Sequence, residues 1–315
     1  MNVKLNDIIK HFAEAKWIGN GEAHFEKVTA FQDLQGKPYP QSISWVNDKN
    51  AQLAHAQEIN VGLLILSEES YAHLKNANCN FLIVENPRQT FAQILALYFK
   101  NKREPKIENT AVIHPSASIG SDCYIGHHVV IEANCKIGNE CSILHNTVIL
   151  ENTLIGNHVT IGANNTIGNY GFGYEKDDVG NFQVIEHQGG VVIHDHVEIH
   201  NNTCIDRGVL GNTELHENVK VDNHVHIAHG VTIGKNSLII ANVMIGGSAK
   251  IGEDVWVAPS TSIKNQIKIA DKTFTGIGAV VLKETAEKEV VIGNPAISME
   301  EHKKWSEKRK KLMKE

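Results

Sequence analysis

The sequence has few cysteines, no excess of positive charge and no long apolar run at its start, and each absence excludes a class of protein. Its five cysteines form no C-x-x-C pair and are odd in number, which argues against a zinc ribbon and a closed disulfide framework. Thirty Lys and Arg stand against 36 Asp and Glu, a net charge of −6, so no nucleic-acid partner is expected. Charges interrupt every apolar stretch of MNVKLNDIIKHFAEA, so we expect no secretory signal, no membrane insertion and a cytoplasmic location.

The sequence does contain an aliphatic residue at every sixth position. Isoleucine recurs eleven times from Ile107 to Ile167; the pattern resumes for three hexads from Ile193 and, after a frame shift near RGVLGN, for ten hexads from Leu215 to Ile269, 24 in all. Six is a multiple of the strand period of two but not of 3.6, so the unit is a short strand followed by a turn. Three hexads then form one coil of a triangular solenoid, giving about eight coils.

Two smaller patterns accompany the aliphatic residues. Glycine often follows them directly, as after Ile119 and Ile125, and we interpret these glycines as bends that need an unusual backbone dihedral. A small or medium residue stands two positions before each aliphatic residue and should also point inward. Cys123, Cys135 and Cys141 occupy such positions, so we interpret them as packing groups and not as redox groups.

The regions outside the hexads lack the six-residue repeat. The stretches ISWV, VGLLILS and NFLIVEN predict strands, and NPRQTFAQILALYF predicts a helix with Asn86 as its N-cap and Pro87 as its first residue. We therefore predict a small α/β domain over 1–100, a mainly β repeat domain over 107–297 and a short basic helix over 298–315. That helix fits a solvated terminus or a docking surface for an acidic protein.

The longest interruption of the repeat is residues 169–190, NYGFGYEKDDVGNFQVIEHQGG. A solenoid interior is filled with side chains, so chemistry must take place on the outside, on insertions or between subunits. Long loops inside a regular repeat are usually functional. We therefore predict that Phe172 and Tyr174 line an apolar groove, with a purely structural flap as the alternative.

Five stretches outside the plain hexads resemble one family of hexapeptide-repeat acyltransferases. They are GFGY at 171–174, CIDRGVL at 204–210, VDNHVHIAHGVTIG at 221–234, GGSAKIG at 246–252 and TGIGAVV at 275–281. With these motifs the chain is similar, over nearly its whole length, to the UDP-3-O-acylglucosamine N-acyltransferases of lipid A synthesis. The resemblance implies a left-handed parallel β-helix in a homotrimer. It also implies transfer of a 3-hydroxyacyl chain from acyl carrier protein to the 2-amine of a UDP-linked, 3-O-acylated glucosamine, and we expect no cofactor.

The histidine of the IAH motif, His229, matches the family's proposed general base. N-acylation needs a neutral amine to attack a thioester, and an imidazole with a pKa of about 6.5 accepts the proton near neutral pH. Asp222, seven residues earlier, is predicted to fix the tautomer of His229 or to stabilise its imidazolium. Backbone amides of Gly246 or Gly247 are candidates for stabilising the oxyanion.

The resemblance also implies contacts with the substrates. The family stacks uracil on aromatic residues in a segment corresponding to ISWVNDKN, so Trp45 is predicted to stack and Asn47 to read the base edge. Core packing is the alternative for Trp45, and the family's second aromatic falls near Asn50. Gln266 stands where the family commonly has a second histidine that contacts donor or phosphate, and Ala279 stands where a bulkier residue limits acyl length.

Other functions remain compatible with the sequence. The stretch VWVAPSTSI at 255–263 also resembles acetyltransferases, so one alternative is a coenzyme A-dependent acyltransferase that acts on another nucleotide-linked amino sugar for surface polysaccharide. A non-catalytic β-helix scaffold is the other, and the motif around His229 argues against it. No cysteine or carboxylate set completes a metal site with the histidines at 224, 226 and 229, so no metal is expected.

Overall fold

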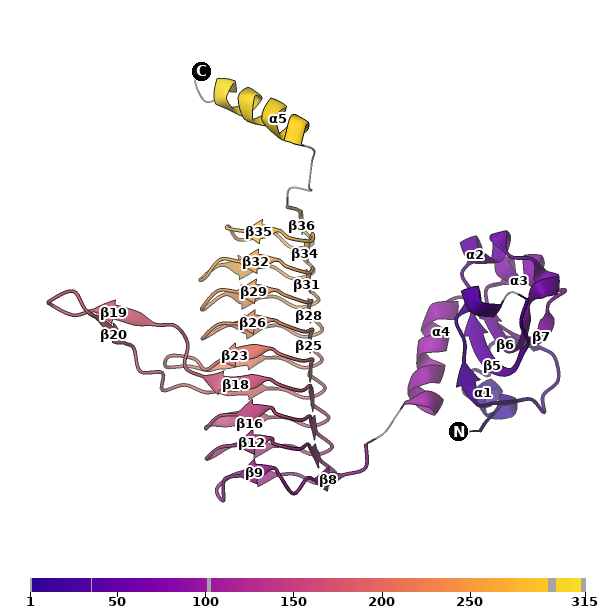
Figure 1. The fold of residues 1–315 in the computed structure, drawn as a ribbon, viewed down its shortest axis with the longest axis horizontal. Coiled ribbons are helices and arrows are strands. Elements are labelled where there is room, and N and C mark those ends of the chain that lie inside the picture. Colours follow the sequence, from indigo (N-terminus) through magenta and orange to yellow (C-terminus); the bar gives the residue numbers. More distant parts are fainter. Residues whose placement is uncertain (1, 35, 101–102, 294–298, 313–315) are drawn as a thin grey trace. The chain divides into compact units, whose positions relative to one another are not determined.

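The computed structural model describes residues 2–34, 36–100, 103–293 and 299–312. The chain forms two compact units, Met1–Lys102 and Arg103–Glu315, drawn as ribbons in Figure 1. The terminal helix predicted over 298–315 is α5, Met299–Leu312; residues 298 and 313–315 of this prediction, and 294–297 of the predicted repeat domain, lie outside the described residues. Within the described part of the chain, no helix has the length and apolarity that crossing a bilayer requires.

The N-terminal unit contains a five-stranded sheet of order β2-β7-β6-β5-β4, parallel except for β2. Its strands are β2 Lys16–Ile18, β4 Lys27–Val28, β5 Tyr39–Trp45, β6 Asn60–Leu66 and β7 Asn78–Ile83, beside an antiparallel pair of β1 Val3–Lys4 and β3 His24–Phe25. Its helices are α1 Leu5–His11, α2 Asp48–Leu53, α3 Glu68–Leu74 and α4 Pro87–Ile94, with short helical turns at Phe31–Leu34, Ala56–Glu58 and Leu95–Phe99.

Both faces of this sheet are buried, as is usual for parallel strands. Leu64 and Leu66 of β6 belong to one hydrophobic cluster, and Leu63 and Ile65 belong to the other. The three predicted strands are confirmed as parts of β5, β6 and β7. The predicted helix start is also confirmed, because the Asn86 side chain accepts a hydrogen bond from the backbone N–H of residue 89 and α4 begins at proline.

The second unit is a parallel β-helix with three sheet faces (Figure 1). Face 1 has ten strands: β8 Lys106–Ile107, β11 Tyr124–Ile125, β14 Ser142–Ile143, β17 Thr160–Ile161, β22 Glu198–Ile199, β25 Lys220–Val221, β28 Leu238–Ile239, β31 Trp256–Val257, β34 Phe274–Thr275 and β36 Val290–Val291. Face 2 has nine: β9 Val112–Ile113, β12 Val130–Ile131, β15 Val148–Ile149, β18 Thr166–Asn169, β23 Cys204–Asp206, β26 His226–Ile227, β29 Met244–Ile245, β32 Ser262–Ile263 and β35 Val280–Val281. Face 3 has eight: β10 Ser118–Ile119, β13 Lys136–Ile137, β16 Thr153–Ile155, β21 Val191–Ile193, β24 Thr213–Leu215, β27 Thr232–Ile233, β30 Lys250–Ile251 and β33 Lys268–Ile269.

The six-residue repeat becomes a stack of aliphatic side chains inside these faces. Ile125 pairs with Ile143, and Ile143 with Ile161, and all three are fully buried. The 24 predicted hexads are each a strand, and β34, β35 and β36 extend the helix beyond them. Cys123 and Cys141 are buried and donate to backbone carbonyls of the next coil, as expected for packing groups.

The corners of the coils show why glycine follows the aliphatic residues. Our interpretation that these glycines supply an unusual dihedral was wrong for most of them. The left-handed residue instead lies three positions after the aliphatic one, as at His128 and Asn134, with φ of 57° and 60°. Gly138 is needed because a Cβ there would lie 2.5 Å from the carbonyl oxygen of Gly156 in the next coil. Close approach of neighbouring coils, and not backbone freedom, selects this glycine.

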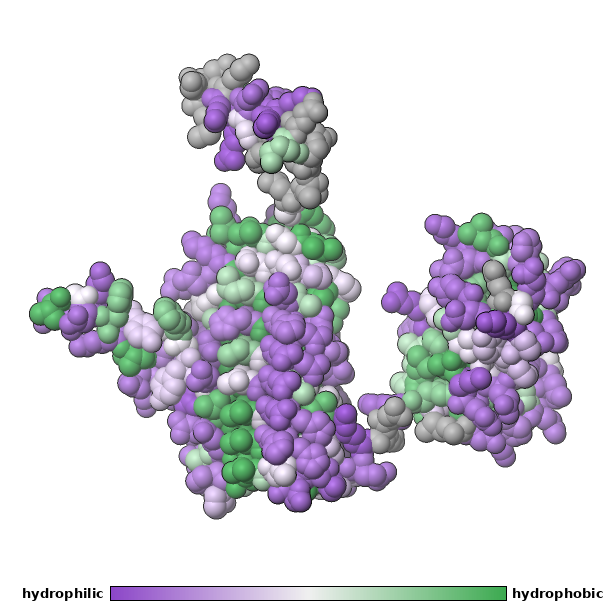
Figure 2. Space-filling model, in the orientation of Figure 1, coloured by the Kyte–Doolittle hydropathy of each residue, from purple (hydrophilic) through white to green (hydrophobic). Residues whose placement is uncertain are grey.

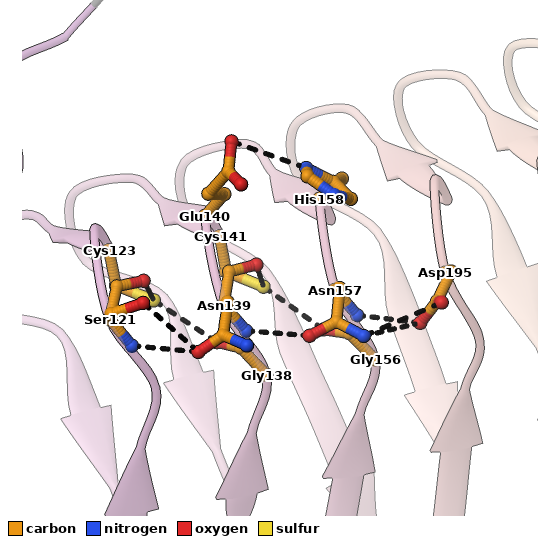
Figure 3. A network of polar contacts seen from close by, with 10 residues as sticks. All are labelled: Ser121, Cys123, Gly138, Asn139, Glu140, Cys141, Gly156, Asn157, His158 and Asp195. Carbon is orange, nitrogen blue, oxygen red and sulfur yellow. Dashed lines mark hydrogen bonds and ion pairs between the residues drawn. The ribbon is translucent and has the colours of Figure 1, made fainter.

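An amide ladder holds the edge between faces 3 and 1 (Figure 3). The backbone N–H of Ser121 donates to Asn139 Oδ1 at 2.9 Å, and the N–H of Asn139 donates to Asn157 Oδ1 at the same distance. The N–H of Asn157 in turn donates to Asp195 Oδ1 at 2.7 Å. Each coil therefore satisfies a turn amide of the preceding coil, which fixes the stacking of successive corners.

Residues 169–190 leave the helix and form a projecting hairpin of β19 Tyr174–Lys176 and β20 Phe182–Val184 (Figure 1). Its apolar side chains are uncovered: Phe172 is 90% exposed, Val179 81% and Phe182 70%. Figure 2 shows hydrophobic surface on this arm and along part of one side of the β-helix.

Candidate active site

The insertion and the IAH motif lie on the same edge of the β-helix, between faces 2 and 3, which we call the site edge. The insertion connects β18 to β21, the RGVLGN segment connects β23 to β24, and the IAH corner connects β26 to β27. One regular coil contains three hexads, so corners at His229, Gly247 and Asn265 follow one another along this edge at 18-residue intervals. The N–H of Ser248 donates to the His229 carbonyl at 2.8 Å and joins two of these corners.

A pocket of about 360 Å³ opens on the site edge. It contains four of the predicted site residues: Phe172, His229, Gly247 and Gln266. The other residues that line it were not predicted from the sequence: Asp206, His226, Ala228, Ser248 and Asn265. Tyr174, also predicted for this groove, does not line the pocket; it is half-exposed and contacts Phe172, with 4.9 Å between ring centroids.

The imidazole of His229 is confined between two glycines. A Cβ at Gly247 would lie 2.6 Å from Nε2 of His229, and a Cβ at Gly171 would lie 2.9 Å from the Cβ of His229. Burial lowers the pKa of His229, and nearby His187 lowers it further, whereas the carboxylate of Asp206 acts in the opposite direction. The ring is therefore held in one place as a neutral imidazole, which is the form that a general base requires.

His187, which the sequence analysis missed, packs edge-on against His229 with 5.5 Å between ring centroids. It is 1% exposed, and its Nδ1 donates to the carbonyl oxygen of Ile185 at 2.6 Å, which fixes the orientation of the ring. Nε2 has no hydrogen-bond partner among the described residues. No hexad predicts His187, because only the path of the insertion returns it to the site edge.

Within the chain, the carboxylate beside His229 is Asp206 and not the predicted Asp222. Asp222 lies after β25, on the edge between faces 1 and 2, whereas His229 lies one edge further along the coil. The Asp222 carboxylate accepts from Asn223 at 2.7 Å and from the N–H of Ala241 at 3.1 Å. It therefore satisfies turn amides on its own edge.

Asp206 is 5% exposed, and burial raises the pKa of its carboxyl group, while His226 and His229 oppose that shift. One carboxylate oxygen lies 3.7 Å from Nε2 of His226. Asp206 escaped the sequence analysis because the frame shift at RGVLGN lengthens its coil by four residues. Across that longer coil, Cys204 is the register partner of His226, and Asp206 follows on the same strand.

Two further predictions need correction. The N–H of Gly246 already donates to the carbonyl of Ile263 at 2.9 Å, which removes Gly246 from the oxyanion candidates. The Gly247 N–H has no acceptor among the described residues and stays a candidate. Ala279 is 2% exposed within the core cluster, so its side chain points into the β-helix and does not line an external acyl groove.

The predicted uracil contacts lie in the N-terminal unit and stay predictions. Trp45 is half-buried and packs near Phe91 with 6.4 Å between ring centroids. The Asn47 side chain accepts from the N–H of Asn50 at 2.8 Å and caps α2, which leaves its amide nitrogen to donate. A larger cavity of about 910 Å³ in this unit lies beside the ends of β6 and β7 and is lined by neither Trp45 nor Asn47.

Stacked hexads with a histidine pocket on one edge define a hexapeptide-repeat acyltransferase. The family model for bacterial transferase hexapeptide repeats matches residues 212–247, and the model for the GMPPB C-terminal domain matches 107–210. The chain is 35% identical to a UDP-3-O-acylglucosamine N-acyltransferase of Campylobacter lari, over 90% of this chain and 91% of that protein. It is 41% identical to UDP-3-O-acylglucosamine N-acyltransferase 2 of Legionella pneumophila strain Paris, over 71% of this chain and 70% of that one. The chain belongs to the UDP-3-O-acylglucosamine N-acyltransferase family.

Solved structures support the fold alone. The UDP-N-acetylglucosamine acyltransferase of Francisella novicida aligns with a TM-score of 0.56 and 23% identity, over 64% of this chain and 73% of that one. LpxA from Acinetobacter baumannii aligns with a TM-score of 0.53 and 24% identity, over 63% and 77%. These likenesses agree with a mainly β fold built from long parallel sheets.

Substitution of Gly247 by alanine should lower the turnover number by about 10²-fold, because the new Cβ displaces the His229 ring from its working position. Thermal unfolding should change little, since the residue lies at a surface corner. The matched control is Gly211→Ala, where a Cβ meets nothing within 4 Å. Equal activity of the two variants would show that His229 needs no fixed position.

Proposed function

We propose that this acyltransferase moves a 3-hydroxyacyl chain from the thioester of acyl carrier protein to the 2-amine of a UDP-linked, 3-O-acylated glucosamine. The observation that carries the proposal is a neutral, fixed His229 in an external pocket of a chain of this family. The named relatives act on UDP-3-O-acylglucosamine, and the amine they acylate needs a base of this kind.

The reaction requires one proton acceptor and one oxyanion donor. The amine nitrogen attacks the thioester carbonyl carbon as His229 accepts the amine proton, which forms the C–N bond and an oxyanion. The free N–H of Gly247 is the proposed donor to that oxyanion. Collapse of the intermediate breaks the C–S bond, the imidazolium returns its proton to the leaving thiolate, and the products are an amide and a thiol.

The remaining predicted residues are proposed to contact the acyl chain, the donor or a phosphate, and the uracil ring. Phe172 and Tyr174 provide apolar surface near the pocket, which suits an acyl chain. Gln266 lines the same pocket and offers an amide to the donor or to a phosphate. Trp45 and Asn47 are proposed to hold the uracil ring, by analogy with the family.

A cytoplasmic homotrimer is part of the proposal. The hairpin leaves Phe172, Val179 and Phe182 uncovered in the single chain, and an apolar arm of this kind is usually covered by a partner. In a trimer, each arm would pack against the neighbouring β-helix and help to enclose the site edge. Sedimentation at several protein concentrations tests this assembly.

The assay that tests the function supplies the protein with 3-hydroxyacyl carrier protein or acetyl-CoA and a panel of UDP-amino sugars, and it follows amide formation by mass spectrometry. We expect product with the carrier-bound donor and the 3-O-acylated glucosamine. Product from acetyl-CoA alone would favour the polysaccharide alternative. No product with any pair would favour the scaffold.

The pH dependence should report the environment of His229. Its pKa is lowered, so the neutral base persists to lower pH, and the acid limb of kcat/KM should fall with a midpoint below about 6.5. His187 is one cause of the lowering, so His187→Gln should move the midpoint upward. An acid limb above 6.5 in the wild type, measured with a chelator present, would contradict this assignment.

A further inference from the structure

Three potential metal ligands share one patch of face 2 beside the pocket. Cys204 and His226 are register partners on the neighbouring strands β23 and β26, and Asp206 lies two residues beyond Cys204. Since alternate residues of a strand point to the same side, Cys204 and Asp206 both face outward, and Ile205 between them is fully buried. The β-helix therefore fixes the three side chains on one rigid surface.

The distances among the three groups approach those of a tetrahedral site. Cys204 Sγ lies 3.6 Å from Asp206 Oδ1, and His226 Nε2 lies 3.7 Å from Asp206 Oδ2. One ligand atom from each residue can be chosen so that all lie within 4.8 Å of one another. Tetrahedral zinc with bonds of about 2.0–2.3 Å holds its ligand atoms roughly 3.3–3.8 Å apart, so small side-chain rotations complete the set.

The carboxylate of Asp206 lacks a strong partner within this patch. It is nearly buried, yet within the described part of the chain its side chain contacts only a thiol at 3.6 Å and an imidazole at 3.7 Å. The adjacent cation, Arg207, points elsewhere: its guanidinium pairs with Glu151 and donates to the carbonyl of Gly168. A buried carboxylate in such surroundings is costly unless a proton or a cation neutralises it.

We propose that Cys204, Asp206 and His226 bind one divalent cation of the zinc class. A thiolate, an imidazole and a carboxylate suit zinc or cobalt and disfavour magnesium and calcium, which prefer all-oxygen shells. Asp206 and His226 line the pocket, so the fourth coordination position opens into it. The histidines alone indicated no such site, because Cys204 and Asp206 join them only through the register of the coils.

An occupied site should also inhibit acyl transfer, a consequence that rests on the proposed function. The cation would stand in the pocket of His229, where its charge opposes protonation of the base and its fourth ligand takes space from the substrate. The site itself does not depend on that reaction, so binding and inhibition are measured separately.

Titration of tag-free, reduced, metal-stripped protein with Co²⁺ tests the binding. We expect one equivalent to produce a near-ultraviolet thiolate charge-transfer band and strong visible absorption typical of tetrahedral Co²⁺, and Zn²⁺ to abolish both. Cys204→Ser should remove the charge-transfer band and weaken binding by at least about tenfold. His226→Gln and Asp206→Asn should weaken binding with the band retained at saturation, which a variant that merely unfolds would not do.

Cys79→Ser is the matched control, because Cys79 is a partly buried thiol in the N-terminal unit. This variant should bind Co²⁺ like the wild type. The absence of saturable binding in the wild type, or an unchanged band in Cys204→Ser, would overturn the site. Stoichiometric Zn²⁺ binding that leaves amide formation unchanged would overturn the inhibition alone, and a lack of activity in metal-free protein would instead count against the proposed function.

Discussion

Substitution of His229 by alanine is expected to lower kcat for amide formation by about 10²- to 10⁴-fold. The physical reason is that the attacking amine must lose a proton as the C–N bond forms, and the imidazole of His229 is the base that we propose accepts it in the pocket. The residue is partly exposed at a corner, so the fold should tolerate the change. Amide formation from 3-hydroxyacyl carrier protein, followed by mass spectrometry, gives the rate.

Two neighbouring histidines serve as controls for this experiment. His224→Asn changes an exposed corner residue of the same motif, and asparagine accepts the φ of 59° found there. That variant should keep its rate. His226→Gln, assayed with a chelator, separates the two imidazoles of the pocket. A large loss in His226→Gln with near-normal activity in His229→Ala would transfer the role of base to His226.

Substitution of Arg207 by alanine should destabilise the protein by about 3 kcal/mol, because a buried side chain loses its packing, its hydrogen bond to a buried carbonyl and its ion pair with the half-exposed Glu151. Arg207 is 2% exposed; its Nη1 lies 2.9 Å from Glu151 Oε1, and its Nε donates to the carbonyl of Gly168 at 2.6 Å. The guanidinium also lies over the ring of Tyr170 at 5.1 Å. Its loss leaves the buried carbonyl of Gly168 unpaired at the base of the insertion, so activity should fall as well.

Urea unfolding at one fixed protein concentration measures this effect, because assembly makes apparent stability depend on concentration. Arg103→Ala is the control: Arg103 also lies over an aromatic ring, that of Tyr124 at 5.4 Å, but it is exposed. That change should stay within about 0.5 kcal/mol. Equal effects of the two substitutions would mean that the buried contacts of Arg207 contribute nothing to the free energy of unfolding.

The repeat domain was predictable because one physical requirement governs it at every coil. An inward aliphatic side chain, a strand of two or three residues and a corner recur with a period that only a β structure satisfies. The same rule predicts that the side chain of Ala279 points inward, because Ala279 stands two positions before the inward Val281. It belongs to the core. Its assignment to an acyl groove followed family analogy against the pattern of the hexads.

The candidate site was only partly predictable from the sequence. Its residues come from different coils, and the register of the paired strands, not their spacing in the sequence, brings them together. His229 and Gly247 lie one regular coil apart, a relation that the period of three hexads contains. Asp206 lies across the lengthened coil at RGVLGN, and His187 returns by way of the irregular insertion, so no periodic rule places either residue beside His229. Asp222, although close in sequence, lies around a corner on another edge.

Because each coil closes after three hexads, the number of residues between two corners determines whether they lie on the same edge. Six residues added between His229 and Gly247 would leave every hexad intact, and every aliphatic side chain would still point inward. All later corners would nevertheless turn by one face, and Gly247 and Gln266 would leave the edge that His229 occupies. An insertion of 18 residues, one full coil, would keep Gly247 and Gln266 on the same edge but would place them one coil further from His229. Such insertions would leave the free energy of unfolding nearly unchanged but would abolish activity. The number of residues in each coil is therefore itself a functional property of this protein.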